Sequence, residues 1–91
     1  MDAKKLSIPK NLVYREIDDE LVLLNLETSE YYSLNHTGAV IWKALEKGKK
    51  TDAIASDLSR EFKIDRETAD SDLEAFLRAV TKLGLVKYEK K

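Results

Sequence analysis

Few side chains of this sequence could do chemistry, and none stands in a recognisable catalytic arrangement. There are no cysteines, which excludes disulfides, thiolate metal sites and cysteine nucleophiles. His36 is the single histidine, and a lone imidazole without a second histidine or a carboxylate at fixed helical spacing is a weak metal ligand or general base. The acidic run Asp18-Asp19-Glu20 lacks the ligand spacing of a calcium loop. We therefore expect no enzymatic activity, no metal and no cofactor.

A short aromatic run predicts the element that carries the function. The run is Glu30-Tyr31-Tyr32-Ser33-Leu34, and it ends at Asn35. Tyrosine favours half-buried strand positions, and an asparagine side chain can accept the free N–H groups of a helix's first turn. The two tyrosines face opposite sides of a sheet, and the sequence leaves open which of them faces the core. This strand comes last in chain order, so one of its edges can be left unpaired and can accept a strand from another chain.

The composition is that of one small domain with a balanced charge. The 91 residues include 16 Lys and Arg against 17 Asp and Glu, and the net charge of −1 argues against a dedicated polyanion binder. The first nine residues contain no apolar run of signal-peptide length, and the longest apolar runs are far too short to span a bilayer. These features favour the cytoplasm and no contact with a membrane.

The pattern of apolar and polar residues predicts an α+β domain: a three-stranded antiparallel sheet followed by three helices, like a winged helix-turn-helix module. Residues 1–11 are expected to be a flexible arm and residues 12–88 the single domain. The strands are predicted at 12–17, 20–26 and 30–34. The first helix is predicted from about Gly38 to a stop at Gly48, and Thr51 and Asp65 are expected to cap the second and third helices.

The third predicted helix offers a second wall for a groove beside the last strand. Its apolar residues recur at steps of four and three, which places Phe76 and Val80 in the core. Leu73 and Leu77, one turn apart, are either core residues or the lining of that groove. Asp70 lies on the same side, where it could hold a basic peptide residue, although a solvated helix charge is the commoner explanation.

The ordered set of strand and helix residues resembles the PqqD family, small peptide chaperones also called precursor-peptide recognition elements. The resemblance covers residues 10–88 and is carried by the following positions: Val22-Leu23-Leu24, Tyr31-Tyr32-Ser33-Leu34-Asn35, Gly38, Ile41-Trp42, Leu45, Gly48, Ile54, Leu58, Phe62, Asp72, Phe76-Leu77 and Leu83-Gly84-Leu85-Val86. The Tyr-Tyr-x-Leu-Asn form is more similar to the stand-alone leader-binding proteins of lasso-peptide clusters.

The resemblance implies binding without chemistry. The leader segment of a ribosomally made precursor peptide would add as a strand to the last strand, beside the third helix, with Glu30 to Leu34, Asp70, Leu73 and Leu77 as the binding residues. A leader peptidase and a cyclase would be the partners. The first alternative is a PqqD-type chaperone that presents a precursor peptide to a radical SAM enzyme. The more distant alternative, a winged-helix DNA-binding protein, would place an acidic third helix against phosphates.

Overall fold

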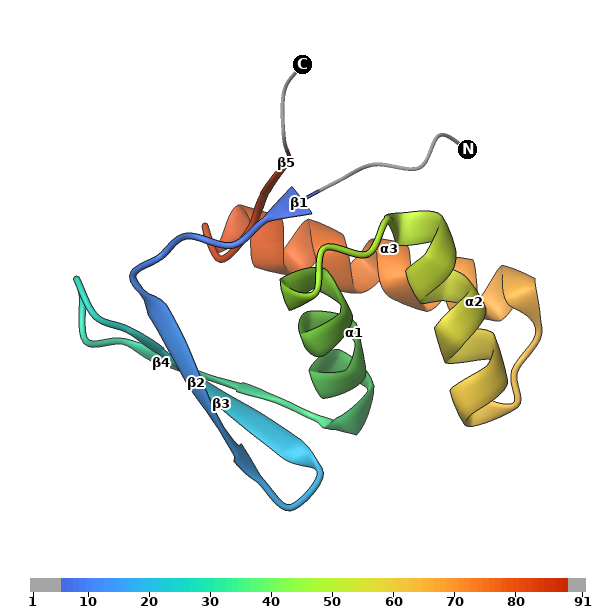
Figure 1. Ribbon diagram of the computed structural model, residues 1–91, viewed down its shortest axis with the longest axis horizontal. Coiled ribbons are helices and arrows are strands. Elements are labelled where there is room, and N and C mark those ends of the chain that lie inside the picture. Colours follow the sequence, from blue (N-terminus) through green and yellow to red (C-terminus); the bar gives the residue numbers. More distant parts are fainter. Residues whose placement is uncertain (1–5, 89–91) are drawn as a thin grey trace.

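A small antiparallel sheet packs against the first of three helices, and the other two helices lie beyond it (Figure 1). The computed structural model describes residues 6–88. The strands of the sheet are β2 (Leu12–Ile17), β3 (Glu20–Asn25) and β4 (Tyr31–Leu34). The helices are α1 (His36–Glu46), α2 (Thr51–Phe62) and α3 (Arg66–Lys82). The strands neighbour one another in the order β2-β3-β4, so the predicted α+β class and the antiparallel meander are confirmed.

The first hairpin turns within two residues. Ile17 pairs with Glu20, and Asp18 between them adopts a left-handed φ of 57°, as the tight turns that match strand twist require. In β3, the side chains of Leu21 and Leu23 are fully buried against the helices. Their alternation with the more exposed residues between them gives the sheet one core face and one outer face.

The connection from β3 to β4 is held by one side chain. Asn25 Oδ1 accepts hydrogen bonds from the backbone N–H groups of Glu27 and Thr28, at 2.9 and 3.2 Å. Ser29 adopts a left-handed φ of 66°, and the backbone N–H of Asn25 then meets the carbonyl of Glu30 at 2.9 Å. This Asx-type turn fixes where β4 starts.

The prediction that residues 1–11 form a flexible arm is wrong from Leu6 onward. Leu6–Ser7 form strand β1, which pairs antiparallel with β5 (Lys87–Tyr88), and the side chain of Leu6 is buried in the core. A two-residue strand paired with the far end of the chain leaves no periodic signal in the local sequence. The part of the predicted arm over residues 1–5 lies outside the described residues.

Two of the helix starts follow the sequence prediction. Asn35 is the N-cap of α1, where its Oδ1 accepts the backbone N–H of Gly38 at 2.9 Å. Asp65 caps α3 in the same way, accepting the backbone N–H of Thr68 at 2.7 Å. Hydrogen bonding to the Thr68 side chain first, and this backbone bond second, hold the pKa of its carboxyl below the usual value. The cap of α1 follows β4 directly, so the strand and the helix are fixed to one another.

The start of α2 differs from the prediction by one position. Lys50, which forms no side-chain capping bond, occupies the N-cap, and Thr51 is the first helical residue, with a buried side chain. Gly48 has a φ of 81°, which confirms the predicted stop of α1, and Gly84 has a left-handed φ of 79° just after α3.

The core lies between the inner face of the sheet and the three helices. Its largest fully buried side chains are Trp42, Leu21, Leu23, Ile41, Ile54, Leu58, Leu85 and Val86. Trp42 is 2% exposed and is therefore a core residue. None of the helices within residues 6–88 combines the length and the apolar character needed to cross a membrane.

Candidate functional site

β4 has one paired edge and one edge that no other described strand occupies. It pairs with β3 in the register Leu21 with Leu34 and Leu24 with Tyr31, and it is the last strand of the three-stranded sheet. In Figure 1 it runs directly into the first turn of α1. An edge of this kind presents a row of backbone donors and acceptors to a further strand.

The register identifies which backbone groups of β4 are available. Asn25 donates its N–H to the carbonyl of Glu30, so these two residues form a hydrogen-bonded pair. Because such pairs alternate along an antiparallel ladder, Tyr32 and Leu34 also bond to β3. The N–H and C=O groups of Tyr31 and Ser33 therefore point to the open edge.

The side chains of β4 divide between the two faces of the sheet. Tyr32 and Leu34 are half-buried and pack against the core, as expected if Tyr32 is the inward tyrosine. Tyr31 is 70% exposed and lies with Ser33 on the outer face. The sequence left open which tyrosine faces the core, and the structure shows that it is Tyr32 and not Tyr31.

Glu30 anchors the start of this strand. The Tyr32 hydroxyl donates a hydrogen bond to Glu30 Oε1 at 3.0 Å, and the Thr28 hydroxyl lies 3.2 Å from the same oxygen. The bond to this carboxylate raises the pKa of Tyr32. Glu30 is exposed, and its carboxylate is already hydrogen-bonded within this chain. Its main role in the structure is therefore to position the start of β4.

On α3, the structure reverses the predicted burial of two neighbours. Leu77 is only 5% exposed and belongs to the core, as does Leu73 at 2%. Phe76, predicted to be the core residue, is half-buried and lies beside Gly38 of α1. The helix is therefore rotated relative to the sequence prediction, and Phe76 and Leu34, the last residue of β4, lie on either side of the Gly38 α-carbon. The binding roles predicted for Leu73 and Leu77 stay predictions, and these two residues would lie beneath the surface of a groove.

The Asp70 carboxylate shares an arginine partner with the neighbouring helix α2. Its Oδ1 accepts a hydrogen bond from Arg66 Nε at 3.0 Å, and the same guanidinium binds Asp52 Oδ1 at 2.6 Å and Ser56 Oγ at 3.1 Å on α2. At about 100° per residue, Asp70 lies roughly 120° around α3 from Phe76. The prediction that Asp70 faces the strand edge is therefore not matched by its contacts, which turn it toward α2.

The flank of α3 that carries Phe76 contains residues that the sequence prediction missed. Asp72, Ala79 and Leu83 lie within about 60° of Phe76 around the helix. Asp72 is exposed and Leu83 is 54% exposed. The spacing of these four positions, 72, 76, 79 and 83, is itself an i, i+4, i+7, i+11 stripe, and it could have been recognised beside the core stripe.

Among residues 6–88 no three His, Cys, Asp or Glu side chains gather in a way that could hold a metal ion. The arrangement instead offers an open strand edge, an exposed tyrosine on one side of it and a partly apolar helix flank on the other. These features are typical of a small α+β domain that accepts an added strand.

The chain belongs to the family "Coenzyme PQQ synthesis protein D (PqqD)", which matches residues 20–86. Among solved structures, it is similar to TbiB1 in complex with the TbiA(beta) leader peptide, with 38% identity, a TM-score of 0.84, and 92% of this chain and 98% of that chain covered. It is also similar to a lasso peptide synthetase B1 complexed with the leader peptide, with 26% identity, a TM-score of 0.82, and 90% and 96% covered. No curated protein matches the chain. The family predicted from the sequence is confirmed.

Proposed function

We propose that this chain binds the leader segment of a ribosomally made precursor peptide and delivers it to the enzymes that modify the peptide. The observation that carries the proposal is the open edge of β4 in a fold shared with two proteins that are complexed with leader peptides. The proposal needs no catalytic group on this chain, because the proposed task consists only of binding the precursor peptide and presenting it to other enzymes.

The leader adds as an antiparallel strand along β4. The backbone groups of Tyr31 and Ser33 supply hydrogen bonds that tolerate many leader sequences, since main-chain groups are common to all peptides. Selectivity comes from the side chains on either side of the added strand. Tyr31 and Ser33 flank it on the outer face, while Tyr32 and Leu34 border it on the core side.

The α3 flank forms the second wall of the site. Phe76 and Leu83 offer partly exposed apolar surface, on which an apolar leader side chain can be buried. Asp72 is exposed on the same flank and replaces Asp70 as the carboxylate that attracts a basic leader residue. Leu73 and Leu77 support this wall from below.

The partners that fit this task are a leader peptidase and a cyclase of a lasso-peptide pathway. This choice is favoured over a radical SAM enzyme because a similar structure is a lasso peptide synthetase B1. DNA binding is disfavoured because the exposed face of α3 carries Glu67, Asp72 and Glu74, whose charges oppose a phosphate backbone.

The test is a titration of the whole chain against a fluorescent leader peptide from the precursor gene that neighbours its own gene. We expect saturable binding in the nanomolar to micromolar range, and no saturation with a scrambled leader of the same composition. A labelled DNA duplex serves as the second ligand. Saturable binding of the duplex without binding of the leader would reverse the assignment.

Delivery is tested separately, in a reaction with the peptidase encoded beside this gene. Adding the chain should accelerate cleavage of the full precursor but not of a precursor without its leader. If the chain binds the leader yet leaves the cleavage rate unchanged, it is a binder that serves another enzyme.

A further inference from the structure

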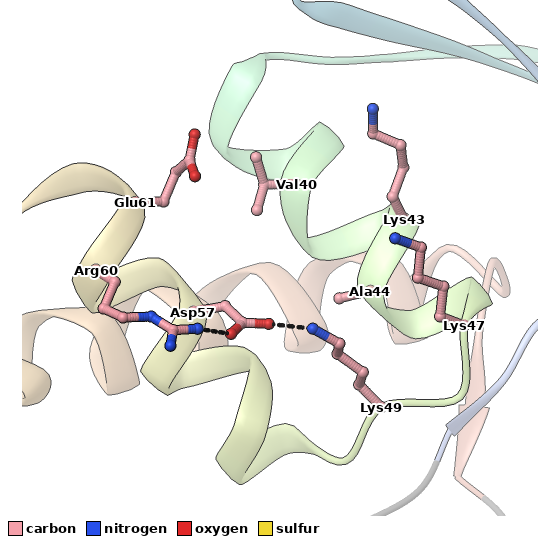
Figure 2. A pocket seen from close by; sticks show the side chains of 8 residues that line it. All are labelled: Val40, Lys43, Ala44, Lys47, Lys49, Asp57, Arg60 and Glu61. Atoms are coloured by element: carbon pink, nitrogen blue, oxygen red, sulfur yellow. Dashed lines mark hydrogen bonds and ion pairs between the residues drawn. The ribbon is translucent and has the colours of Figure 1, made fainter.

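A second surface of the molecule, between α1 and α2, combines cations around a small hollow of about 360 Å³ (Figure 2). We name it the α1–α2 groove. Its cations, contributed by α1, by α2 and by the segment between them, are Lys43, Lys47, Lys49 and Arg60. Two carboxylates, Asp57 and Glu61, and two apolar side chains, Val40 and Ala44, complete the lining.

The cations of the groove outnumber the carboxylates that neutralise them. Asp57 is shared by two cations: Lys49 Nζ lies 2.6 Å from its Oδ2, and Arg60 donates to its Oδ1. The hydrogen bond from Lys49 is the main reason that the pKa of Asp57 is lowered. The Lys47 side chain forms no ion pair with any other residue in the described part of the chain, and Figure 2 shows its ammonium beside the hollow. An incoming anion therefore meets an excess of positive charge.

The remaining lining residues indicate what kind of anion fits. Ala44 is buried and Val40 is half-buried, so the groove has an apolar floor that an inorganic ion or a phosphate backbone would leave unused. Glu61 forms no ion pair among the described residues and would repel a continuous row of phosphates. An acidic peptide segment can satisfy both conditions, because an apolar side chain can interrupt its row of carboxylates and rest on the apolar floor.

The α1–α2 groove is distinct from the strand edge. None of its lining residues belongs to β4 or α3, and Lys43 at its rim pairs through Nζ with Glu16 of β2 at 2.6 Å. A segment in the groove would therefore leave the backbone of Tyr31 and Ser33 accessible. The two surfaces can be occupied at the same time.

We propose that the α1–α2 groove binds an acidic peptide segment of a partner protein. Carboxylates of the segment pair with Lys47, Lys49 and Arg60, and one of its apolar side chains rests on Val40 and Ala44. The charge complementarity favours encounter and orientation more than high affinity, since the groove is open to solvent. This inference does not depend on the proposed leader binding.

The probe is an acetylated hexapeptide of aspartate and glutamate with one central leucine, titrated into the ¹⁵N-labelled chain at low salt. We expect amide shifts confined to α1, α2 and the segment between them, persisting when the β4 edge is occupied by a leader peptide. Shifts at β4 instead would mean that the peptide uses the strand edge, and the proposal would fail.

Matched charge reversals test the residues. Lys47→Glu should weaken peptide binding about tenfold and Lys47→Ala about threefold, whereas Lys10→Glu, an exposed lysine outside the groove, should change it little. Melting temperatures verify that each variant is folded. Equal affinities in all three variants would contradict the proposal.

Two further ligands separate a peptide site from a general anion site. Inorganic triphosphate and a short DNA duplex should bind more weakly than the acidic peptide, because they cannot use the apolar floor. The hexapeptide with its leucine changed to glycine should also lose affinity. If triphosphate binds as tightly as the peptide, the groove is an anion site only and the proposal is wrong.

Discussion

Phe76 of α3 lies directly against Gly38 in the first turn of α1. A β-carbon placed on Gly38 would come within 3.0 Å of Phe76 Cε1 and 3.2 Å of Leu34 Cβ, the last residue of β4. The absence of a side chain at Gly38 is what lets three elements meet at this point. The contact also places the Phe76 ring at the end of the strand edge, where the leader site is proposed.

Gly38→Ala should therefore destabilise the protein although alanine is the better helix former. The helix preference gains about 1 kcal/mol, but overpacking costs typically about 1–3 kcal/mol, and Leu34 Cβ is tied to the backbone and cannot rotate away. We expect a net loss of about 1 kcal/mol in urea unfolding. Combining it with Phe76→Leu should recover part of that loss. If Gly38→Ala alone stabilises the chain, the ring moves aside freely and the contact does not constrain it.

Leu77 and Phe76 should respond differently to truncation. Leu77→Ala removes a buried side chain and should lower the free energy of unfolding by about 2–5 kcal/mol. Phe76→Ala removes a half-buried ring, so we expect a smaller loss of stability and a larger loss of leader affinity. Melting temperatures and leader titrations on both variants measure the two effects. A binding defect confined to Leu77→Ala in a folded protein would support the orientation that the sequence suggested.

Ser33→Pro should abolish leader binding while the sheet survives. The N–H of Ser33 points to the open edge, so proline removes a donor for the added strand and none from the β3–β4 ladder. Ser33→Ala keeps that N–H and should bind normally. Glu16→Pro is the matched control, because the register places its N–H on the free edge of β2. Circular dichroism verifies folding. Unchanged affinity in a folded Ser33→Pro variant would move the site away from β4.

Asp57 should contribute to acid sensitivity. Its carboxyl pKa is lowered in the folded state by the Lys49 bond, so its contribution to stability is complete above the usual aspartate pKa. That contribution is lost as the pH falls through the lowered value. Asp57→Asn should therefore flatten the acid side of a plot of melting temperature against pH. Superimposable curves for the two proteins would show that these exposed ion pairs add nothing measurable.

The sequence predicted the strands β2 to β4 and the three helices well because each of these has a local signal. Asn35 and Asp65 act as caps, Gly48 and Gly84 as left-handed stops, and the strand ends fall within one residue of prediction. Such signals depend on neighbours three or four positions away. They suffice to establish the class of fold.

The candidate site was harder to predict because it depends on how α3 is rotated. Leu77 and Phe76 are adjacent, and both satisfy the same apolar repeat, so the pattern cannot say which one the core takes. The binding role of Asp70 stays a prediction, and the sequence could not show that its partner Arg66 also reaches Asp52 in another helix. The pairing of β1 with β5 likewise joins segments about 80 residues apart, a separation that no local periodicity reports.

The pairing of β1 with β5 has a consequence for engineering. Leu6 and Tyr88 are direct partners, so the chain enters and leaves the domain at neighbouring points. In Figure 1 these points lie at the opposite end of the molecule from the β2–β3 hairpin. A domain with adjacent entry and exit points tolerates insertion into a surface loop of another protein. This chain could thus be grafted into an unrelated enzyme as a cassette, with the edge of β4 left free to capture peptides for its new host.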